Sequence, residues 1–119
     1  DYMTAGANLE RVDTARLSQS ALELYNSIWP TVSATYYETL FTAGYNSYIA
    51  ENYAETIQNL LPVVKADMSY KEGSAAYYIA QAYRKSGDLE TAKPYYQYVV
   101  DNYPDTQQAN TSMEYLSGN

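Results

Sequence analysis

The sequence predicts an all-α fold of about six helices arranged as antiparallel helical hairpins, and three observations lead to this prediction. Apolar residues recur at spacings of three and four along nearly the whole chain, which is the period of an amphipathic helix. No alternation of polar and apolar residues persists long enough to indicate a strand. Glycines, prolines and short polar segments divide the periodic stretches into pieces of helix length.

The first predicted helix covers about residues 7–29 and ends before Pro30. Its apolar stripe consists of Leu17, Ala21, Leu24 and Ile28, widened by Tyr25 and Trp29. Such a stripe either packs on a neighbouring helix or belongs to a coiled coil. The second predicted helix begins near Thr31 or Ser33, because either hydroxyl can accept a hydrogen bond from a free backbone N–H, and it runs to about Ile49.

The rest of the chain divides into four more helices. They are predicted at about 52–66, 74–85, 89–102 and 105–116. Gly87 suits the left-handed residue that ends the helix before it, and Asp88 suits the N-cap of the helix that follows. Asp105 or Thr106 is expected to cap the last helix. Pro94 is expected to kink the helix in which it lies.

The composition of the chain argues against several classes of function. With seven basic and fourteen acidic residues the net charge is −7, which is the wrong sign for binding the phosphates of nucleic acid. No run approaches the ~20 apolar residues that cross a bilayer, so we expect no direct membrane insertion by this segment. Neither cysteine nor histidine is present, which removes thiolate nucleophiles, the commonest general base and the commonest metal ligand. We therefore expect no enzyme activity, no metal site and no cofactor.

Two predicted hairpins, about 36 residues apart, share a pattern when 44–53 is aligned with 80–89. The pattern in the second hairpin comprises Ala80, Tyr83, Gly87, Asp88, Leu89, Ala92, Tyr96 and Pro104. This order of small residue, aromatic residue, Gly-Asp turn, apolar residue, alanine, aromatic residue and closing proline resembles the tetratricopeptide repeat family. The first hairpin departs from it, because Ser47, Thr56 and Met68 stand where the family has an aromatic residue, alanine and proline.

This resemblance implies a right-handed superhelix of antiparallel hairpins. The two repeats would cover about 37–70 and 73–104, followed by a capping helix at 105–116. The repeat domain then spans 35–119, and 1–34 forms a flanking helix and linker. Because two hairpins are fewer than the three or so that a bare solenoid needs, we expect the flanking helices to complete one compact unit.

The resemblance also implies a protein-interaction module that binds a peptide segment or a partner protein in a concave groove. The groove positions of the family correspond to Glu38, Phe41, Tyr45, Tyr48, Ser74, Tyr77, Gln81 and Arg84. Aromatic side chains with polar tips give a large contact area for little lost rotamer freedom. Alternatively, Phe41, Tyr45 and Tyr48 pack against the first helix. The chaperone-binding subgroup holds a carboxylate with lysine and asparagine where this chain has Phe41 and Tyr45, so carboxylate clamping is disfavoured.

A second hypothesis is a structural role, as a spacer or self-associating domain of a larger membrane-anchored or exported protein. In that case the 17–28 stripe and exposed tyrosines would form a homodimer. The segment 103–106, Tyr-Pro-Asp-Thr, followed by Ala109, resembles the ending found in bacterial extracytoplasmic members of the family, such as the Tol-Pal coordinator and outer-membrane assembly lipoproteins. This implies a location in the periplasm or cell envelope. Because the chain begins at Asp1 with no initiator methionine or signal segment, we expect a fragment or a processed protein.

Overall fold

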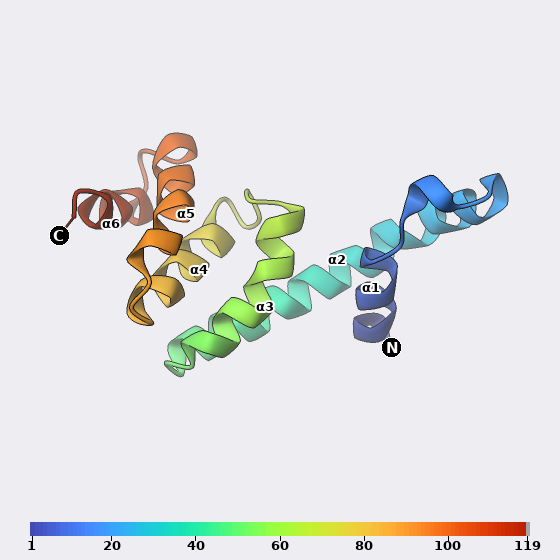
Figure 1. The fold of residues 1–119 in the computed structure, drawn as a ribbon, viewed down its shortest axis with the longest axis horizontal. Coiled ribbons are helices and arrows are strands. Elements are labelled where there is room, and N and C mark those ends of the chain that lie inside the picture. Colours follow the sequence, from blue (N-terminus) through green and yellow to red (C-terminus); the bar gives the residue numbers. More distant parts are fainter. Residues whose placement is uncertain (119) are drawn as a thin grey trace. The chain divides into compact units, whose positions relative to one another are not determined.

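The computed structural model describes residues 1–118, and its regular structure is entirely helical over that range (Figure 1). The elements are α1 (Tyr2–Glu10), a short 3-10 helix η1 (Thr14–Arg16), α2 (Gln19–Ile49), α3 (Tyr53–Ala66), α4 (Ser74–Lys85), α5 (Leu89–Asn102) and α6 (Gln107–Leu116). The predicted all-α class is confirmed. Within the described residues, no helix has the length and apolar character needed to cross a membrane.

Packing divides the chain into two compact units, Asp1–Thr39 and Leu40–Asn119, here called the first unit and the second unit. The division falls inside α2, so this helix contributes residues to both units. The boundary expected near residue 34, within one compact unit, stays a prediction. Each unit has its own contacts.

The structure corrects the predicted ends of the first two helices. Residues 7–29 do not form one helix, because α1 ends at Glu10 and a new helix, α2, begins at Gln19 and continues through Pro30. Pro30 forfeits one backbone hydrogen bond and costs about 3 kcal/mol relative to alanine in a helix interior. The residues that follow, Val32 and Tyr36, are buried, and their packing offsets this cost. Thr31 and Ser33 are therefore interior residues of α2 and not N-caps.

The core of the first unit forms where α1 meets α2. A Cβ atom placed on Gly6 would lie 2.4 Å from Cγ of Tyr36, so only glycine allows this close approach. The Tyr37 hydroxyl donates a hydrogen bond of 2.5 Å to the Glu10 carboxylate, and the Trp29 ring packs edge-on against Tyr37 with 6.0 Å between ring centres. These contacts fix α1 on α2.

The second unit begins with the hairpin formed by residues 40–49 of α2 and by α3. At their crossing, a Cβ atom on Gly44 would lie 2.7 Å from Cγ of Leu60, whose side chain is completely buried. The small residue thus lets the two helices approach, as its place in the repeat pattern predicts. The turn between them ends at Asn52, whose side chain accepts a hydrogen bond from the backbone N–H of Glu55.

The second hairpin, α4 and α5, follows the predicted boundaries closely. Gly87 has φ of 93°, in the left-handed region, and the Asp88 carboxylate accepts a hydrogen bond from the backbone N–H of Thr91, so both predicted roles are confirmed. Thr106 caps α6 by accepting from the backbone N–H of Ala109. α5 continues through Pro94.

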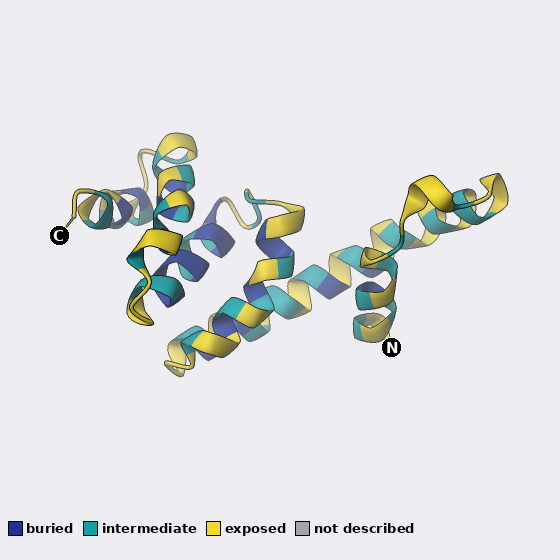
Figure 2. Ribbon diagram, in the orientation of Figure 1, coloured by how far each residue is buried: buried dark blue, intermediate teal, exposed yellow. Residues whose placement is uncertain are grey.

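The core of the second unit is centred on α4. This helix packs on α3, α5 and α6, and α5 also packs on α6. Figure 2 shows buried positions recurring along α3 to α6. Ala80, Ala92 and Tyr96 have no exposed surface, and partly buried aromatic and leucine side chains surround them. Small alanines on the facing helices therefore leave the space that the Tyr96 ring fills.

Candidate functional site

An aromatic surface joins the end of α2 to α4 within the second unit. The ring centre of Phe41 lies 5.6 Å from that of Tyr70, a residue just before α4. The ring centre of Tyr45 lies 5.1 Å from that of Tyr78, which belongs to the second turn of α4. Tyr48, one turn further along α2, also contacts Tyr78, at 5.2 Å. Gln81, one turn further along α4, donates from Nε2 to the Tyr48 hydroxyl at 3.2 Å. The later contacts on α2 thus meet later residues of α4, so this part of α2 and α4 run side by side in the same direction.

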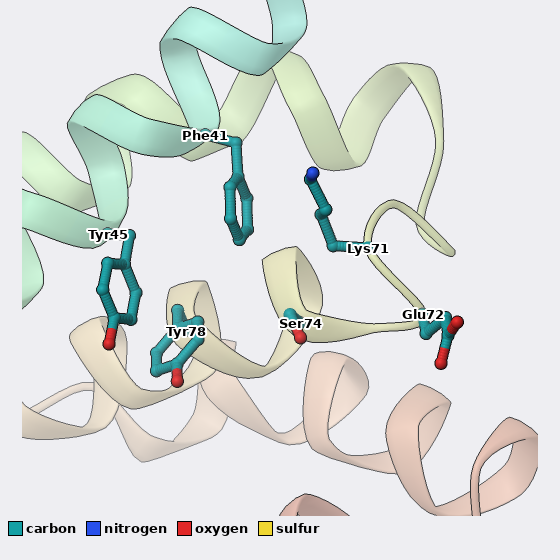
Figure 3. Close-up of a pocket in the computed structure, with 6 residues that line it drawn as sticks. All are labelled: Phe41, Tyr45, Lys71, Glu72, Ser74 and Tyr78. Carbon is teal, nitrogen blue, oxygen red and sulfur yellow. The ribbon is translucent and has the colours of Figure 1, made fainter.

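A cavity of about 410 Å³ opens on this surface, in the size range of small-ligand sites. Its lining residues are Phe41, Tyr45, Lys71, Glu72, Ser74 and Tyr78, and we call it the aromatic groove. Figure 3 shows Phe41 and Tyr45 pointing from α2 toward α4, while Lys71 and Glu72 come from the loop before α4. The Tyr45 side chain remains 38% exposed. The groove therefore presents aromatic carbon, hydroxyl groups and a charged loop.

Two lysines lie over aromatic rings along this surface. The ammonium nitrogen of Lys71 is 5.9 Å from the centre of the Phe41 ring. That of Lys85, the last residue of α4, is 5.1 Å from the Tyr48 ring and 5.7 Å from the Tyr53 ring. A hydrogen bond with Tyr48 raises the pKa of Lys85, so this lysine is a cation at neutral pH.

A network of polar side chains holds the far end of α4 to the rest of the core. Gln81 is buried; its Nε2 donates to the Tyr48 hydroxyl at 3.2 Å, and its Oε1 accepts from the Tyr96 hydroxyl. Nε of Arg84 donates to the same Tyr96 hydroxyl at 3.0 Å, and its guanidinium lies 3.7 Å from the Tyr115 ring centre. Gln81 and Arg84 thus bond within the molecule, and burial raises the pKa of Tyr96 to about 12.

The structure brings together only part of the set that the sequence predicts. Phe41, Tyr45 and Ser74 line the groove, and Tyr48 adjoins it through Tyr78. Tyr77 is half-buried and packs edge-on against Tyr96 with 6.4 Å between ring centres. Burial raises the pKa of Tyr77.

Glu38 lies in the first unit and the seven other predicted groove residues lie in the second. Whether the seven together bind a partner stays a prediction.

Three lining residues of the groove were missed from the sequence. The family resemblance selects Tyr77 as the groove residue and passes over its neighbour Tyr78. Yet Tyr78 shares one face of α4 with three other residues at four-three-four spacing: Ser74, Gln81 and Lys85. That spacing is the signal that could have identified it. Lys71 and Glu72 carry no such signal, because they lie in a loop, with positive φ angles of 53° and 55°.

The lining of the groove offers groups for non-covalent contacts. Among residues 1–118, no three acidic side chains come together in an arrangement that could hold a metal ion. The groups that line the groove are aromatic faces, hydroxyls, one ammonium group and one carboxylate. Burial raises the pKa of Tyr78, so its phenol is uncharged at physiological pH. The Tyr78 hydroxyl also forms a hydrogen bond with Gln108 of α6.

A separate apolar groove of about 170 Å³ lies in the first unit. Its lining residues are Leu9, Val12, Leu17, Ala21, Leu24, Tyr25 and Ile28. The stripe predicted at 17–28 thus forms one wall, and Leu24 is 60% exposed. The homodimer predicted through this stripe stays a prediction.

Comparison with known proteins gives one family match. Residues 74–106 match the tetratricopeptide repeat family. No curated protein and no solved structure matches the chain. Domains built from such repeats commonly bind other proteins or peptides and typically act as scaffolds without catalytic activity. The matched segment begins with α4 and includes α5 and the closing Tyr-Pro turn. The family match and the hairpin geometry together support a tetratricopeptide-family repeat at residues 74–106.

Proposed function

We propose that the second unit is a protein-interaction module that binds a peptide segment of another protein in the aromatic groove. The observation that carries this proposal is the cavity of about 410 Å³ between α2 and α4, with three aromatic side chains in its lining. The family match at residues 74–106 supports a scaffold role for the same unit.

The side chains of the groove suit a peptide. Tyrosine offers a rigid ring with few rotatable bonds, so little entropy is lost when a partner segment covers it. Its hydroxyl, together with the Ser74 hydroxyl on the opposite wall, can exchange hydrogen bonds with peptide N–H and C=O groups. Apolar side chains of the partner would cover the ring faces of Phe41 and Tyr45, which gives affinity through burial.

A selection from a displayed library of random short peptides tests the proposal. The full chain, immobilised, should enrich a family of related sequences, and Tyr45→Ala should lose that enrichment because the exposed ring lines the groove. Leu61→Ala is the matched control, since Leu61 is 39% exposed, close to the 38% of Tyr45, and lies on α3 outside the lining. Circular dichroism should show the same helix content in all three proteins.

Two results would contradict the proposed function. One is the absence of any enriched peptide family, and the other is equal enrichment by the Tyr45→Ala protein. Tyr77→Ala and Arg84→Ala make poorer tests, because both side chains contact the buried Tyr96 and their loss would disturb the core.

We also propose, on the resemblance of segment 103–106 and Ala109 to extracytoplasmic members of the family, that the protein works in the periplasm or cell envelope. Fractionation of the source cells, with an antibody against the chain, tests this location. Recovery with the cytoplasmic markers would contradict it.

A further inference from the structure

A long stretch of the first unit is folded without burying any of its residues. No residue between 7 and 31 is buried, and Figure 2 shows the early part of α2 as exposed and intermediate positions. The same stretch contains four leucines, one valine, one isoleucine and one tryptophan. Because a helix owes most of its stability to the packing of an apolar face, this stretch fits a further polypeptide surface that covers it.

The first unit is also small for a unit that stands alone. It comprises only residues 1–39, and units of about 40 residues or fewer usually need disulfides, a bound metal or oligomerisation to be stable. The sequence contains no cysteine. Within 1–39 no three acidic side chains come together in an arrangement that could hold a metal ion. Of these three means, oligomerisation is the one that the residues of the first unit support.

The uncovered apolar residues form a groove with a protruding side chain beside it. The volume of the groove is about 170 Å³, close to the roughly 150 Å³ of a cavity that holds a small apolar molecule. Its lining includes Leu9, Val12 and Leu17 from α1 and the segment after it, and Leu24 and Ile28 from α2. Leu24 also projects from the surface, since it is 60% exposed. One surface thus offers both an apolar recess and an apolar projection.

A surface with both features is complementary to a second copy of itself. In a twofold contact the same residues of each copy meet, so Leu24 of each copy can enter the groove of the other. Antiparallel pairing of two α2 helices about Leu24 places Ala21 of one copy opposite Ile28 of the other, so that a small side chain faces a large one. Parallel pairing would set Ala21 against Ala21 and Ile28 against Ile28, which leaves a gap at one point and crowds the other.

The distribution of charge permits this self-association. The chain carries a net charge of −7, so two copies repel each other wherever their acidic residues meet. Residues 17–37 contain a single charged residue, Glu23, which does not line the groove. The positions beside the stripe are Ser20, Tyr25 and Ser27, whereas paired helices often carry at such positions the charges that select a different partner. The groove therefore lies where two copies meet with little repulsion.

We infer that two copies of the chain form an antiparallel dimer through the early part of α2, with Leu24 at the twofold axis and each Leu24 side chain in the apolar groove of the other copy. The second copy covers the apolar stripe and completes a core that the first unit lacks by itself. Each dimer carries two aromatic grooves, one in each second unit. The inference concerns the first unit and does not depend on the peptide that those grooves bind.

Sedimentation equilibrium of the full chain tests the dimer. We expect a reversible monomer–dimer equilibrium, and Leu24→Glu should raise the dissociation constant by about a hundredfold, because it removes a buried leucine from each copy and brings two carboxylates to the axis. Ile49→Glu is the matched control, since Ile49 is 62% exposed, close to the 60% of Leu24, and is the last residue of the same helix. This control should leave the dissociation constant unchanged.

Single cysteines test the orientation, because the chain has no cysteine of its own. In a glutathione redox buffer, a mixture of the Ala21→Cys and Ile28→Cys proteins should form a disulfide-linked dimer with one copy of each, which mass spectrometry identifies. Facing positions bring the two Cα atoms within about 7 Å, the reach of a disulfide. Each protein alone should cross-link far less, and Ile49→Cys gives the background rate.

Three results would overturn the inference. The first is a monomer at every concentration, and the second is an unchanged dissociation constant in the Leu24→Glu protein. The third is cross-linking of Ala21→Cys or Ile28→Cys alone as readily as in the mixture, because this result requires a parallel pair. A monomeric chain that still enriches a peptide family would overturn the dimer and leave the proposed function standing.

Discussion

Tyrosine hydroxyls in the core of the second unit have polar partners within the molecule. Tyr96 has no exposed surface, and its hydroxyl donates to Gln81 and accepts from Arg84. Gln81 and Arg84 are groove positions in the family pattern, so the sequence alone assigns them to a partner. Both side chains instead form hydrogen bonds with Tyr96, which is fifteen residues from Gln81 and twelve from Arg84. These bonds depend on how α4 and α5 pack, and the spacing of residues along one helix does not reveal that packing. The rings on α2 could be predicted because they share one helix face.

The buried tyrosine makes stability sensitive to alkaline pH. Burial raises the pKa of Tyr96 from its ordinary value of 10.0 to about 12, because an ionised phenolate would lose solvation. The resulting stabilisation is complete below about pH 10 and is lost as the pH rises through about 12. We expect the urea midpoint to fall over that interval, and Tyr96→Phe to make the fall shallower. An equally steep fall in that variant would assign the effect to other tyrosines.

The close approach at Gly44 predicts a second measurable effect. Gly44→Ala would place a methyl group 2.7 Å from the side chain of Leu60, which is completely buried and cannot move aside freely. We expect the free energy of unfolding to fall by about 2 kcal/mol, a typical cost of overpacking. In a Leu60→Ala background the same substitution should cost much less, because the obstructing atoms are absent. Urea denaturation of the four proteins measures the difference, and additive effects would contradict the close contact.

Among the elements, the four helices after Ala50 could be predicted almost to the residue, whereas the first two could not. Gly87, Asp88 and Thr106 mark helix ends through local chemistry that involves only neighbouring residues. Pro30 gives an equally strong local signal for a helix end, yet α2 continues through it. The outcome there depends on the packing of Val32 and Tyr36, which the local pattern does not contain.

The continuity of α2 leads to a prediction about Pro30. Pro30→Ala restores a backbone donor in the helix interior and removes the steric clash of the proline ring, so we expect unfolding to require about 2 kcal/mol more free energy. Pro104→Ala is the control, because Pro104 lies between α5 and α6, outside any helix, and should change stability by less than about 0.5 kcal/mol. Urea denaturation followed by circular dichroism measures both. No gain from Pro30→Ala would indicate that the helix breaks at this position.

At the scale of the whole molecule, the two units differ in how much core they possess. The first unit buries Gly6, Val32 and Tyr36 within 1–39, whereas the second buries a continuous set of residues from α3 to α6. A segment of about 40 residues seldom buries enough surface to be stable by itself. Local opening should therefore cost less free energy in the first unit than in the second.

Hydrogen exchange can test this difference in the intact chain. We expect the amides of α1 and of the first half of α2 to exchange fastest among the helices, and those of α4 and α5 to exchange slowest, because α4 packs on three other helices. Exchange followed by mass spectrometry of peptic fragments gives the comparison under native conditions. Equal protection of α1 and α4 would show that the two units open together.

The packing of Trp29 against two tyrosines, stacked on Tyr25 and edge-on to Tyr37, gives the chain an optical label that needs no engineering. Trp29 is the only tryptophan, and it lies in the first unit, with its ring centre 5.9 Å from that of Tyr25 and 6.0 Å from that of Tyr37. Most of the sixteen tyrosines, including those of the aromatic groove, belong to the second unit. Indole emission therefore reports the state of the first unit, while phenol absorbance reports mainly the second, so a single unlabelled sample can distinguish which unit responds to a bound peptide.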